Sequence, residues 1–441
     1  MFKHLLCIVA LSLLPVSGAR ANENAAVSGP WILTFMAAGE THAVRATLHV
    51  EGGVVTGNIY EARLSGTFQN DRLDLTMLNA RGGEEGKLSG VLRDGKLSGG
   101  GTLWGVTLEG WAAVRPATPP PAPQAHTFDP TNYYRYLSSS YDPALRVFPA
   151  DTVRTKLVDE DGRDENGKQR SVGGYPVVGP IYVEGALPGD LLAVHFKKVR
   201  VNRAAADSGH ELIGAAAETE YLLNARRAKD FDADWKLDPA AGTASLAAPS
   251  ARLGALALPV QPTVGIVGVA PPGRQAVVSR SGGDNFGGHL GYNEIGEDVT
   301  VYLPVFHEGA LLFLGEGQAA QGDGQVAGEG IETSLDLEFT VDVLPRKSFQ
   351  VPYAENASEM MFIGVGGSLE EALRRATTGL ATYLEREYGL NASESATLLG
   401  VAAKYRIAKV SGAPDEQTTV VAKIPKAVLR QIAKPAPPKA P

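Results

Sequence analysis

The sequence predicts a mainly β protein with helices confined to its C-terminal part. Short runs of alternating apolar and polar residues, separated by Gly-, Asn- and Asp-rich turns, fill residues 29–115. Strand-like apolar runs continue as far as about residue 344, and beyond Pro345 a capping signal at residues 368–371 precedes apolar residues at helical spacing. The length of 441 residues is sufficient for two or three domains.

We expect residues 28–115 to form an accessory domain, either a β-meander or a small β-barrel. Residues 48–57 alternate around a Gly-Gly turn, which is a hairpin signal, and residues 64–73 recur in similar form as residues 88–97. Closing such a meander into a barrel hides its edge strands. Four aromatic side chains are expected to fill the interior: Trp31, Phe35, Trp104 and Trp111.

The two ends of the chain and one internal stretch read as segments outside the folded domains. Residues 1–21 combine a short basic start, an apolar run and an Ala-Arg-Ala cleavage signal, which predicts a cleavable signal peptide and export to the periplasm or medium. The apolar run is too short to span a membrane. The Pro-rich residues 116–128 are predicted to be a stiff linker and residues 433–441 a disordered tail, which leaves 129–432 for the larger domain.

Composition excludes several classes of function. The net charge is −8 and no dense basic patch is present, so nucleic acid is not an expected partner. The only cysteine, Cys7, lies inside the predicted signal peptide. The mature chain therefore has no disulfide, no cysteine-bound zinc and no thiol nucleophile.

Two glycine-rich loops in the larger domain indicate a site. Residues 281–294 and 315–325 carry Asp, Asn, His, Glu and Gln side chains, and short apolar strands at 299–306 and 310–314 lie between them. Glycine permits positive φ and close backbone approach, and rigid strands hold polar side chains where a ligand reaches them. Residues 204–254, which are Ala-rich, are interpreted as an insertion with little regular sheet.

Five segments resemble the acetamidase/formamidase family in order and spacing. They are Gly-Pro-Ile-Tyr-Val-Glu-Gly-Ala-Leu-Pro-Gly-Asp at 179–190, Asn-Phe-Gly-Gly at 285–288, Tyr-Leu-Pro-Val at 302–305, Gly-Ala-Leu-Leu at 309–312 and Ala-Ala-Gln-Gly-Asp-Gly at 319–324. The resemblance covers about residues 133–432. It implies a β-sandwich domain with a C-terminal α+β portion, hydrolysis of a small linear amide such as formamide or acetamide to carboxylate and ammonia, and a symmetric homo-oligomer.

Three positions depart from the family pattern. Gly291, Gln318 and Gln325 stand where that pattern has Asp, His and Glu, so each change removes a titratable or metal-ligating group. These replacements motivate an alternative of a different class. In it, the chain is an amidase-like protein that has lost catalysis and serves as a small-molecule binding protein or as a scaffold in the cell envelope.

Amide hydrolysis needs an activated nucleophile, a stabiliser for the oxyanion and an acid for the leaving nitrogen. With no Gly-x-Ser-x-Gly elbow and no mature cysteine, the nucleophile is water, activated by a carboxylate or by a divalent metal such as zinc or calcium. The predicted catalytic residues are Glu316, Asp323 and Glu184. The predicted substrate-binding residues are Asn285, Gly288, Gln318 and Gln321. The predicted metal ligands are Asp159, Asp284 and His289. The resemblance places an acidic residue of the run 159–165 near the site, and Asp159 and Asp164 are the two candidates for it.

Overall fold

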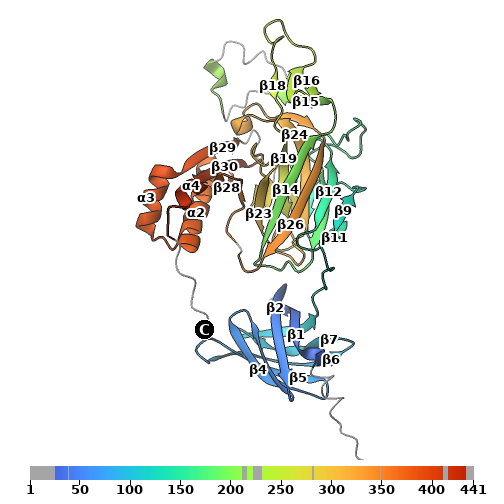
Figure 1. Ribbon diagram of the computed structural model, residues 1–441, viewed down its shortest axis with the longest axis vertical. Helices are drawn as coiled ribbons and strands as arrows, with labels where there is room; N and C mark the ends of the chain where they lie inside the picture. Colours follow the sequence, from blue (N-terminus) through green and yellow to red (C-terminus); the bar gives the residue numbers. More distant parts are fainter. Residues whose placement is uncertain are drawn as a thin grey trace, which may run out of the picture. The chain divides into compact units, whose positions relative to one another are not determined.

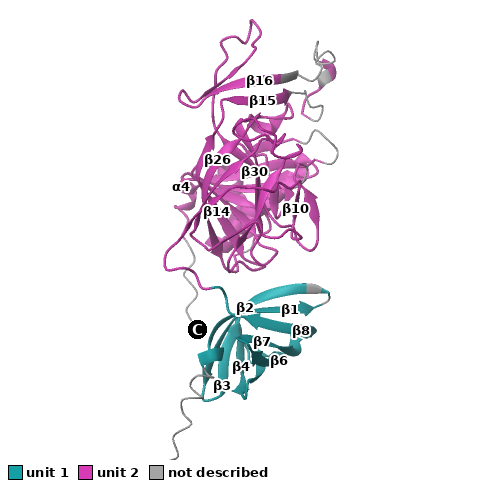
Figure 2. Ribbon diagram, turned by 90° about the vertical axis from the view of Figure 1, so that its right-hand side faces the viewer, with its two compact units in different colours: residues 1–117 teal, residues 118–441 magenta. Residues whose placement is uncertain are grey.

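The computed structural model describes residues 25–37, 39–210, 216–221, 231–280, 283–347, 349–410 and 416–433. The chain divides into two compact units, residues 1–117 and 118–441 (Figure 2). The predicted signal peptide and all but the first residue of the predicted tail lie outside the described residues.

The first unit is a closed antiparallel barrel of eight strands in which β8 pairs back to β1 (Figure 2). Its strands follow one another as β1 (Gly29–Ala37), β2 (Glu40–Glu51), β3 (Val54–Ile59), β4 (Ala62–Gln69), β5 (Arg72–Leu78), β6 (Glu84–Arg93), β7 (Lys96–Leu103) and β8 (Val106–Val114). The predicted barrel is thus confirmed, with Trp31, Phe35 and Trp111 in its core. The prediction for Trp104 is wrong, because this residue occupies the turn between β7 and β8 and is 42% exposed.

The second unit contains two large sheets that share one hydrophobic core, to which Phe196 and Phe339 contribute from one sheet and Ile266 and Phe313 from the other (Figure 1). The nine-stranded sheet has the order β29 (Lys404–Lys409), β30 (Thr418–Pro425), β28 (Glu359–Gly366), β27 (Tyr353–Glu355), β23 (Val299–Pro304), β14 (Leu191–Val201), β26 (Leu335–Leu344), β12 (Thr152–Leu157) and β9 (Ala125–Phe128). This arrangement confirms the mainly β fold class.

The eleven-stranded sheet carries the candidate site. Along its main path lie β18 (Leu258–Pro259), β17 (Thr243–Leu246), β16 (Phe231–Asp238), β15 (Ala205–His210), β25 (Ile331–Thr333), β24 (Leu312–Ala320), β19 (Thr263–Val269), β22 (Gly287–His289) and β21 (Gly283–Asp284). β13 (Val177–Val183) pairs with β24 and also with β11 (Leu145–Val147). A separate two-stranded sheet joins β10 (Tyr136–Ser138) to β20 (Ala276–Val278).

Helices lie against one end of the nine-stranded sheet, as the sequence predicts. The helix α2 (Leu369–Tyr388) packs Ala372, Ala376 and Leu380 against the neighbouring strands β28 and β30, where α4 (Lys426–Leu429) follows β30 (Figure 1). The Ser368 hydroxyl accepts from the amide of Glu371 at its start, and Gly389 ends it with a φ of 68°. A capping box of Asn391 and Glu394 begins α3 (Ala392–Ala402).

Two segments differ from the sequence-based expectation. Residues 125–128, placed in the linker, form β9 at the sheet edge, where Asp151 accepts from the backbone amide of Gln124 and contacts His126. The Ala-rich segment 204–254 contains β15, β16 and β17 together with a short 3-10 helix (Thr219–Tyr221), so the expectation of little regular sheet is wrong. Residues 231–238 alternate between apolar and polar side chains, with Ala233, Trp235 and Leu237 in the core, so a strand signal was present in the sequence and was overlooked.

Candidate active site

The two glycine-rich segments meet on either side of β19. This strand pairs with β22 so that Ile266 lies opposite His289, and with β24 so that Ile266 lies opposite Gly315. The next residue, Glu316, has a φ of 42° and extends its carboxylate over Gly265, where a Cβ atom would lie 1.9 Å from Glu316 Oε1. His289 Nε2 is 3.1 Å from the same oxygen, and both side chains are buried. Residues 27 positions apart in sequence thereby form one buried pair.

A second buried carboxylate reaches this pair through Gln318. Glu332, on β25, is fully buried, and its Oε1 accepts from Gln318 Nε2 at 3.0 Å and from the amide of Gly330 at 3.0 Å. Gln318 Nε2 lies 3.4 Å from Glu316 Oε1, while its carbonyl oxygen accepts from the Thr263 hydroxyl. Burial, together with the charges of Glu160 and Glu316, raises the pKa of Glu332 well above its usual value. Gln318 thus separates two carboxyl groups that repel each other when both are ionised.

A third carboxyl group, Glu160, comes from the loop that follows β12. Its own backbone carbonyl accepts from the amides of Gly174 and Tyr175, which folds the loop back on itself. Burial is the main cause that raises the pKa of Glu160 to about 9, and the charges of Glu329 and Glu316 add to it. The Tyr175 hydroxyl bonds to Glu160 and acts in the opposite direction. At neutral pH the Glu160 carboxyl group therefore holds a proton.

Lys409 supplies a buried cation. The side chain is 5% exposed, and its Nζ is 3.2 Å from His289 Nδ1, which also lies 2.6 Å from the Arg280 carbonyl oxygen. Burial lowers the pKa of Lys409, while the charges of Glu416 and Glu316 oppose that change. An ammonium group so placed offsets part of the negative charge of the buried carboxylates.

Two of the three positions that depart from the family pattern surround Lys409. Gly291 has a φ of 53°, and a Cβ atom there would lie 3.1 Å from Lys409 Cδ and 3.4 Å from Gln325 Oε1. Gln325 is itself 4% exposed. Because Gly291 has no side chain, the lysine stem fits between the loop and β29. The third departure, Gln318, lies between Glu316 and Glu332 and donates a hydrogen bond to each.

The protein leaves several oxygens in this region without a hydrogen-bond donor. Each belongs to a buried acid or carboxamide side chain: Glu160 Oε2, Glu316 Oε2, Glu332 Oε2, Gln321 Oε1 and Gln325 Oε1. An acceptor that is buried without a donor costs free energy on the order of 1–3 kcal/mol, so structures rarely retain such a concentration of them without a purpose. The region favours a ligand that donates hydrogen bonds.

The remaining predicted residues are held elsewhere or have structural roles. Asp323 is 44% exposed and pairs with Arg406 at 3.0 Å, and Asp284 is 50% exposed and pairs with Arg375 at 2.7 Å. Neither carboxylate joins the buried cluster.

Glu184 follows the end of β13 and pairs with Arg146 at 3.0 Å. Since Val177, at the start of β13, is opposite Gly315, Glu184 is seven residues farther along and on the order of 20 Å away from Glu316. Glu184 is therefore not part of the cluster.

Backbone contacts account for the other predicted binding residues. Gln321 Nε2 donates to the carbonyl oxygens of Gly291 and Ala408, which ties the two loops to β29. Gly288 is buried on β22 opposite Val267, where its backbone approaches β19. Asn285 is half-buried in the turn before β22.

The three predicted metal ligands do not converge. Asp159 pairs with Arg203 at 2.6 Å and accepts from the amide of Arg163, Asp284 pairs with Arg375, and His289 contacts Glu316. Within the described ranges, no group of three or more His, Cys, Asp or Glu side chains is arranged to hold a metal ion. The residues present do not fit a zinc or calcium centre, and we derive no chemical step through one.

Sequence reasoning missed Glu160, Tyr175, Glu332 and Lys409. Glu160 follows Asp159 directly, and the structure brings this residue, not its neighbour, to the cluster. Glu332 and Lys409 lie within strands, where alternation alone gives no reason to expect a buried charge. The signal that could have identified them is a charged residue at a strand position that the alternation pattern assigns to the core.

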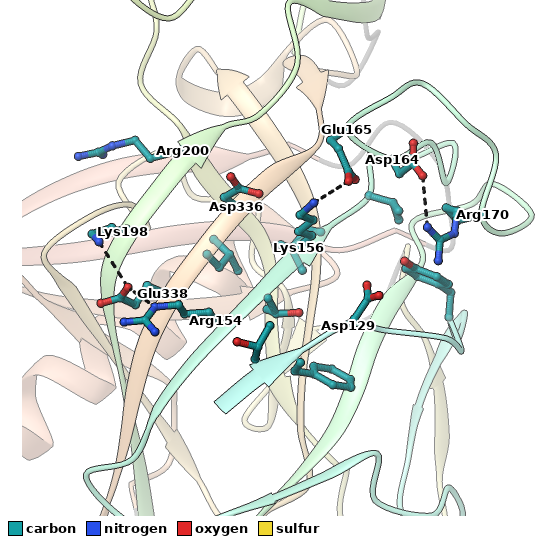
Figure 3. A pocket seen from close by; sticks show the side chains of 17 residues that line it. Asp129, Arg154, Lys156, Asp164, Glu165, Arg170, Lys198, Arg200, Asp336 and Glu338 are labelled. Atoms are coloured by element: carbon teal, nitrogen blue, oxygen red, sulfur yellow. Dashed lines mark hydrogen bonds and ion pairs between the residues drawn. The ribbon is translucent and has the colours of Figure 1, made fainter. Parts of the chain in front are cut away.

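A separate cavity of about 630 Å³ opens beside β12, β14 and β26 (Figure 3). Its walls carry charges of both signs that largely pair, as in Arg154 with Glu338, Lys156 with Glu165 and Arg170 with Asp164. Asp164, the alternative to Asp159, lines this cavity, whereas the other predicted site residues do not. Among the described residues, no helix is long and apolar enough to cross a membrane.

Comparisons with known proteins agree with this architecture. The model of the acetamidase/formamidase family matches residues 273–431, whereas the comparison with curated proteins found no match. A crystal structure of a predicted acetamidase/formamidase from Thermoanaerobacter tengcongensis is 26% identical, with a TM-score of 0.59, and the similarity covers 70% of this chain and 98% of that one.

Two further crystal structures have the same TM-score of 0.59. An acetamidase from Yersinia enterocolitica is 25% identical over 71% of this chain and 96% of that one. An acetamidase from Bacillus halodurans, at 23% identity over 70% and 100%, shares the fold. Each of these similarities covers about 70% of this chain, which is consistent with an N-terminal barrel that is additional to the shared fold. Through its second unit the chain is therefore similar to the acetamidase/formamidase family in sequence and in fold.

Proposed function

We propose that this protein hydrolyses a small linear amide to a carboxylate and ammonia, with water as the nucleophile. The observation that carries the proposal is the buried group of carboxyl side chains in which Glu160 holds a proton while Glu316 pairs with His289. Hydrolysis by water needs one group that takes a proton and another that gives one. The match of residues 273–431 to the model of the acetamidase/formamidase family supports the same class of reaction.

Glu316 is the proposed general base. It takes a proton from water as the water oxygen adds to the amide carbon. His289 Nε2, 3.1 Å from the carboxylate, stabilises its negative charge when the imidazole is protonated. The C–N bond of the tetrahedral intermediate then breaks as Glu160 donates its proton to the nitrogen, which leaves as ammonia. The cycle is restored when the proton on Glu316 passes to the ionised Glu160, directly or through solvent. The carboxylic acid product gives its proton to ammonia or to solvent, so atoms and charges balance.

The substrate supplies donors that the cluster lacks. The NH₂ group of a primary amide fits the unpartnered oxygens of Glu332 and Gln325. The ammonium group of Lys409 and the hydroxyl of Tyr175 are the available donors for the carbonyl oxygen, whose negative charge grows in the intermediate. Donors fixed in a buried site stabilise that charge more than water does.

We also propose that the protein is exported and assembles with itself. The leader-like residues 1–21 support export to the periplasm or medium, and the family resemblance supports a homo-oligomer. Fractionation of the producing cells tests the first proposal, and light scattering on the purified chain tests the second.

The decisive experiment measures ammonia release from formamide, acetamide and propionamide, with and without added divalent metal. We expect turnover by the wild-type chain and a loss of about 10²–10⁴-fold in Glu316→Gln, the range that general acid–base catalysis contributes. Glu184→Gln is the matched control, because the same change at an acid paired with Arg146 leaves the cluster intact. Equal losses in both variants would contradict the assignment of Glu316.

The second candidate is a binding protein in which catalysis has been lost. Its support is specific: Gly291, Gln318 and Gln325, the three departures from the family pattern, all lie in or beside the cluster. If a folded protein releases no ammonia from any of the three amides but binds them in calorimetric titrations, the binding function replaces the hydrolase.

A further inference from the structure

The two ends of the N-terminal barrel differ in their turn residues. The strands run up and down, so the turns after β2, β4 and β6 share one end and those after β1, β3, β5 and β7 share the other. The first end turns at 52–53, 70–71 and 94–95, with Gly, Asn and Asp, which tolerate left-handed φ. At the other end Tyr60 and Trp104 adopt φ values of 52° and 49°.

A bulky side chain at positive φ costs free energy on the order of 1 kcal/mol. Glycine or asparagine would make either turn without this cost, as the opposite end of the same barrel shows. Two aromatic residues in this conformation at one end therefore call for a reason other than turn formation.

The two rings form one surface. The rings of Tyr60 and Trp104 are 6.3 Å apart and inclined by 29°, and Trp104 is 42% exposed. Beneath them Phe35, which is buried, lies 6.3 Å from Trp104 and stacks on His42 at 5.2 Å. Phe35 supports the exposed ring of Trp104 from within the barrel, and Tyr60, which is partly buried, packs against the same core.

The barrel interior does not take a ligand. Its cavity amounts to about 20 Å³ between core side chains, which is room for about one water molecule and far too little for an organic ligand. A ligand at this end must therefore lie across the turns and not inside the barrel.

We propose that the surface formed by Tyr60 and Trp104 binds a polysaccharide with flat, β-1,4-linked sugar rings. The C–H faces of such rings are apolar and stack on the electron-rich faces of aromatic side chains, while their hydroxyl groups remain in water. Two adjacent, nearly parallel rings suit an extended chain of flat units. A strand of nucleic acid would also stack, but it needs a positively charged groove, and the net charge of this chain is −8.

The test uses the full chain and three probes: cellohexaose, chitohexaose and isolated peptidoglycan. The variants are Tyr60→Asn and Trp104→Asn, because asparagine tolerates the left-handed conformation and preserves the turns. Val54→Asn is the matched control, since Val54 is 58% exposed beside the turn at the opposite end. Melting temperatures establish that each variant is folded.

We expect binding of at least one probe, weakened tenfold or more in Trp104→Asn and in Tyr60→Asn and unchanged in Val54→Asn. Binding of chitohexaose and peptidoglycan alone identifies an N-acetylated wall glycan, and binding of cellohexaose identifies an unsubstituted glucan. No binding of any probe by the wild-type chain, or equal binding by all variants, would overturn the proposal. Should Trp104→Asn fail to fold, Tyr60→Asn decides. Amide turnover is expected to be unchanged in both, so this result stands apart from the proposed hydrolase.

Discussion

Replacing Glu160 by glutamine should change how the stability of the protein depends on pH. The pKa of Glu160 is raised from 4.5 to about 9 in the folded state, mainly by burial. Between these values the folded protein holds a proton that the unfolded chain has released, so folding is favoured at low pH and loses free energy as pH rises towards 9. The slope is about −1.4 kcal/mol per pH unit for one proton.

Glutamine occupies a similar volume and does not titrate, so the variant lacks this slope. From pH 6 to pH 8 the free energy of unfolding of Glu160→Gln should therefore rise by up to about 3 kcal/mol relative to wild type. Urea denaturation monitored by tryptophan fluorescence at pH 6, 7 and 8 measures the difference. Coupling to Glu316, Glu329 and Glu332 spreads the effect over several groups, and its sign is unchanged.

Glu165→Gln is the control on the same loop. The ion pair with Lys156 lowers the pKa of Glu165, so this group is ionised in both folded and unfolded states above pH 6. Its variant should give a curve parallel to that of wild type. A parallel curve for Glu160→Gln as well would refute the conclusion that Glu160 carries a proton, and with it the proposed general acid.

Two further predictions concern geometry and buried charge. Gly265→Ala places a Cβ atom where the Glu316 carboxylate now lies, and it should reduce kcat/KM for amide hydrolysis by about 10²-fold. Gly322→Ala is the control, because its Cβ atom meets nothing within 4 Å, and kcat/KM should be unchanged in the same ammonia assay. Arg203→Met removes the partner of the buried Asp159 and should lower the free energy of unfolding by about 3–5 kcal/mol, measured by urea denaturation. A loss below about 1 kcal/mol would show that the pair is dispensable.

The sequence was sufficient for the architecture because local patterns determine much of it. The turn at residues 52–53 and the repeat of 64–73 at 88–97 correspond to paired strands of the barrel. As predicted, α2 begins at the Ser368 cap, whose hydroxyl accepts a backbone hydrogen bond, and ends at Gly389, which adopts a positive φ. In the Ala-rich segment 204–254 the sheet was missed although residues 231–238 alternate between apolar and polar side chains, because the alanine-rich composition was given more weight than this alternation.

The site was harder to predict because its members are brought together by pairing across β19. The meeting of His289 and Glu316 was within reach, since both lie on glycine-rich segments joined by strands. The surface positions of Asp284 and Asp323 could not be predicted. The sequence does not distinguish a loop carboxylate that points inward from one that pairs with a surface arginine. Burial, which the sequence does not specify residue by residue, decides between them.

Charge balance explains why the departures from the family pattern occur together. An acid at position 291 would bring its carboxylate against the Lys409 stem and Gln325, and an acid at 325 would add another negative charge close by. The cluster already contains Glu160, Glu316 and Glu332, and the raised pKa values of two of them show how strongly burial opposes further charge. With neutral side chains at 318 and 325, the charges that favour the protonated form of Lys409 are those of Glu416, Glu316 and Glu332. The replacements therefore change which side chains of the site carry charge. The pairing of β19 with β22 and β24, which brings the site together, is retained.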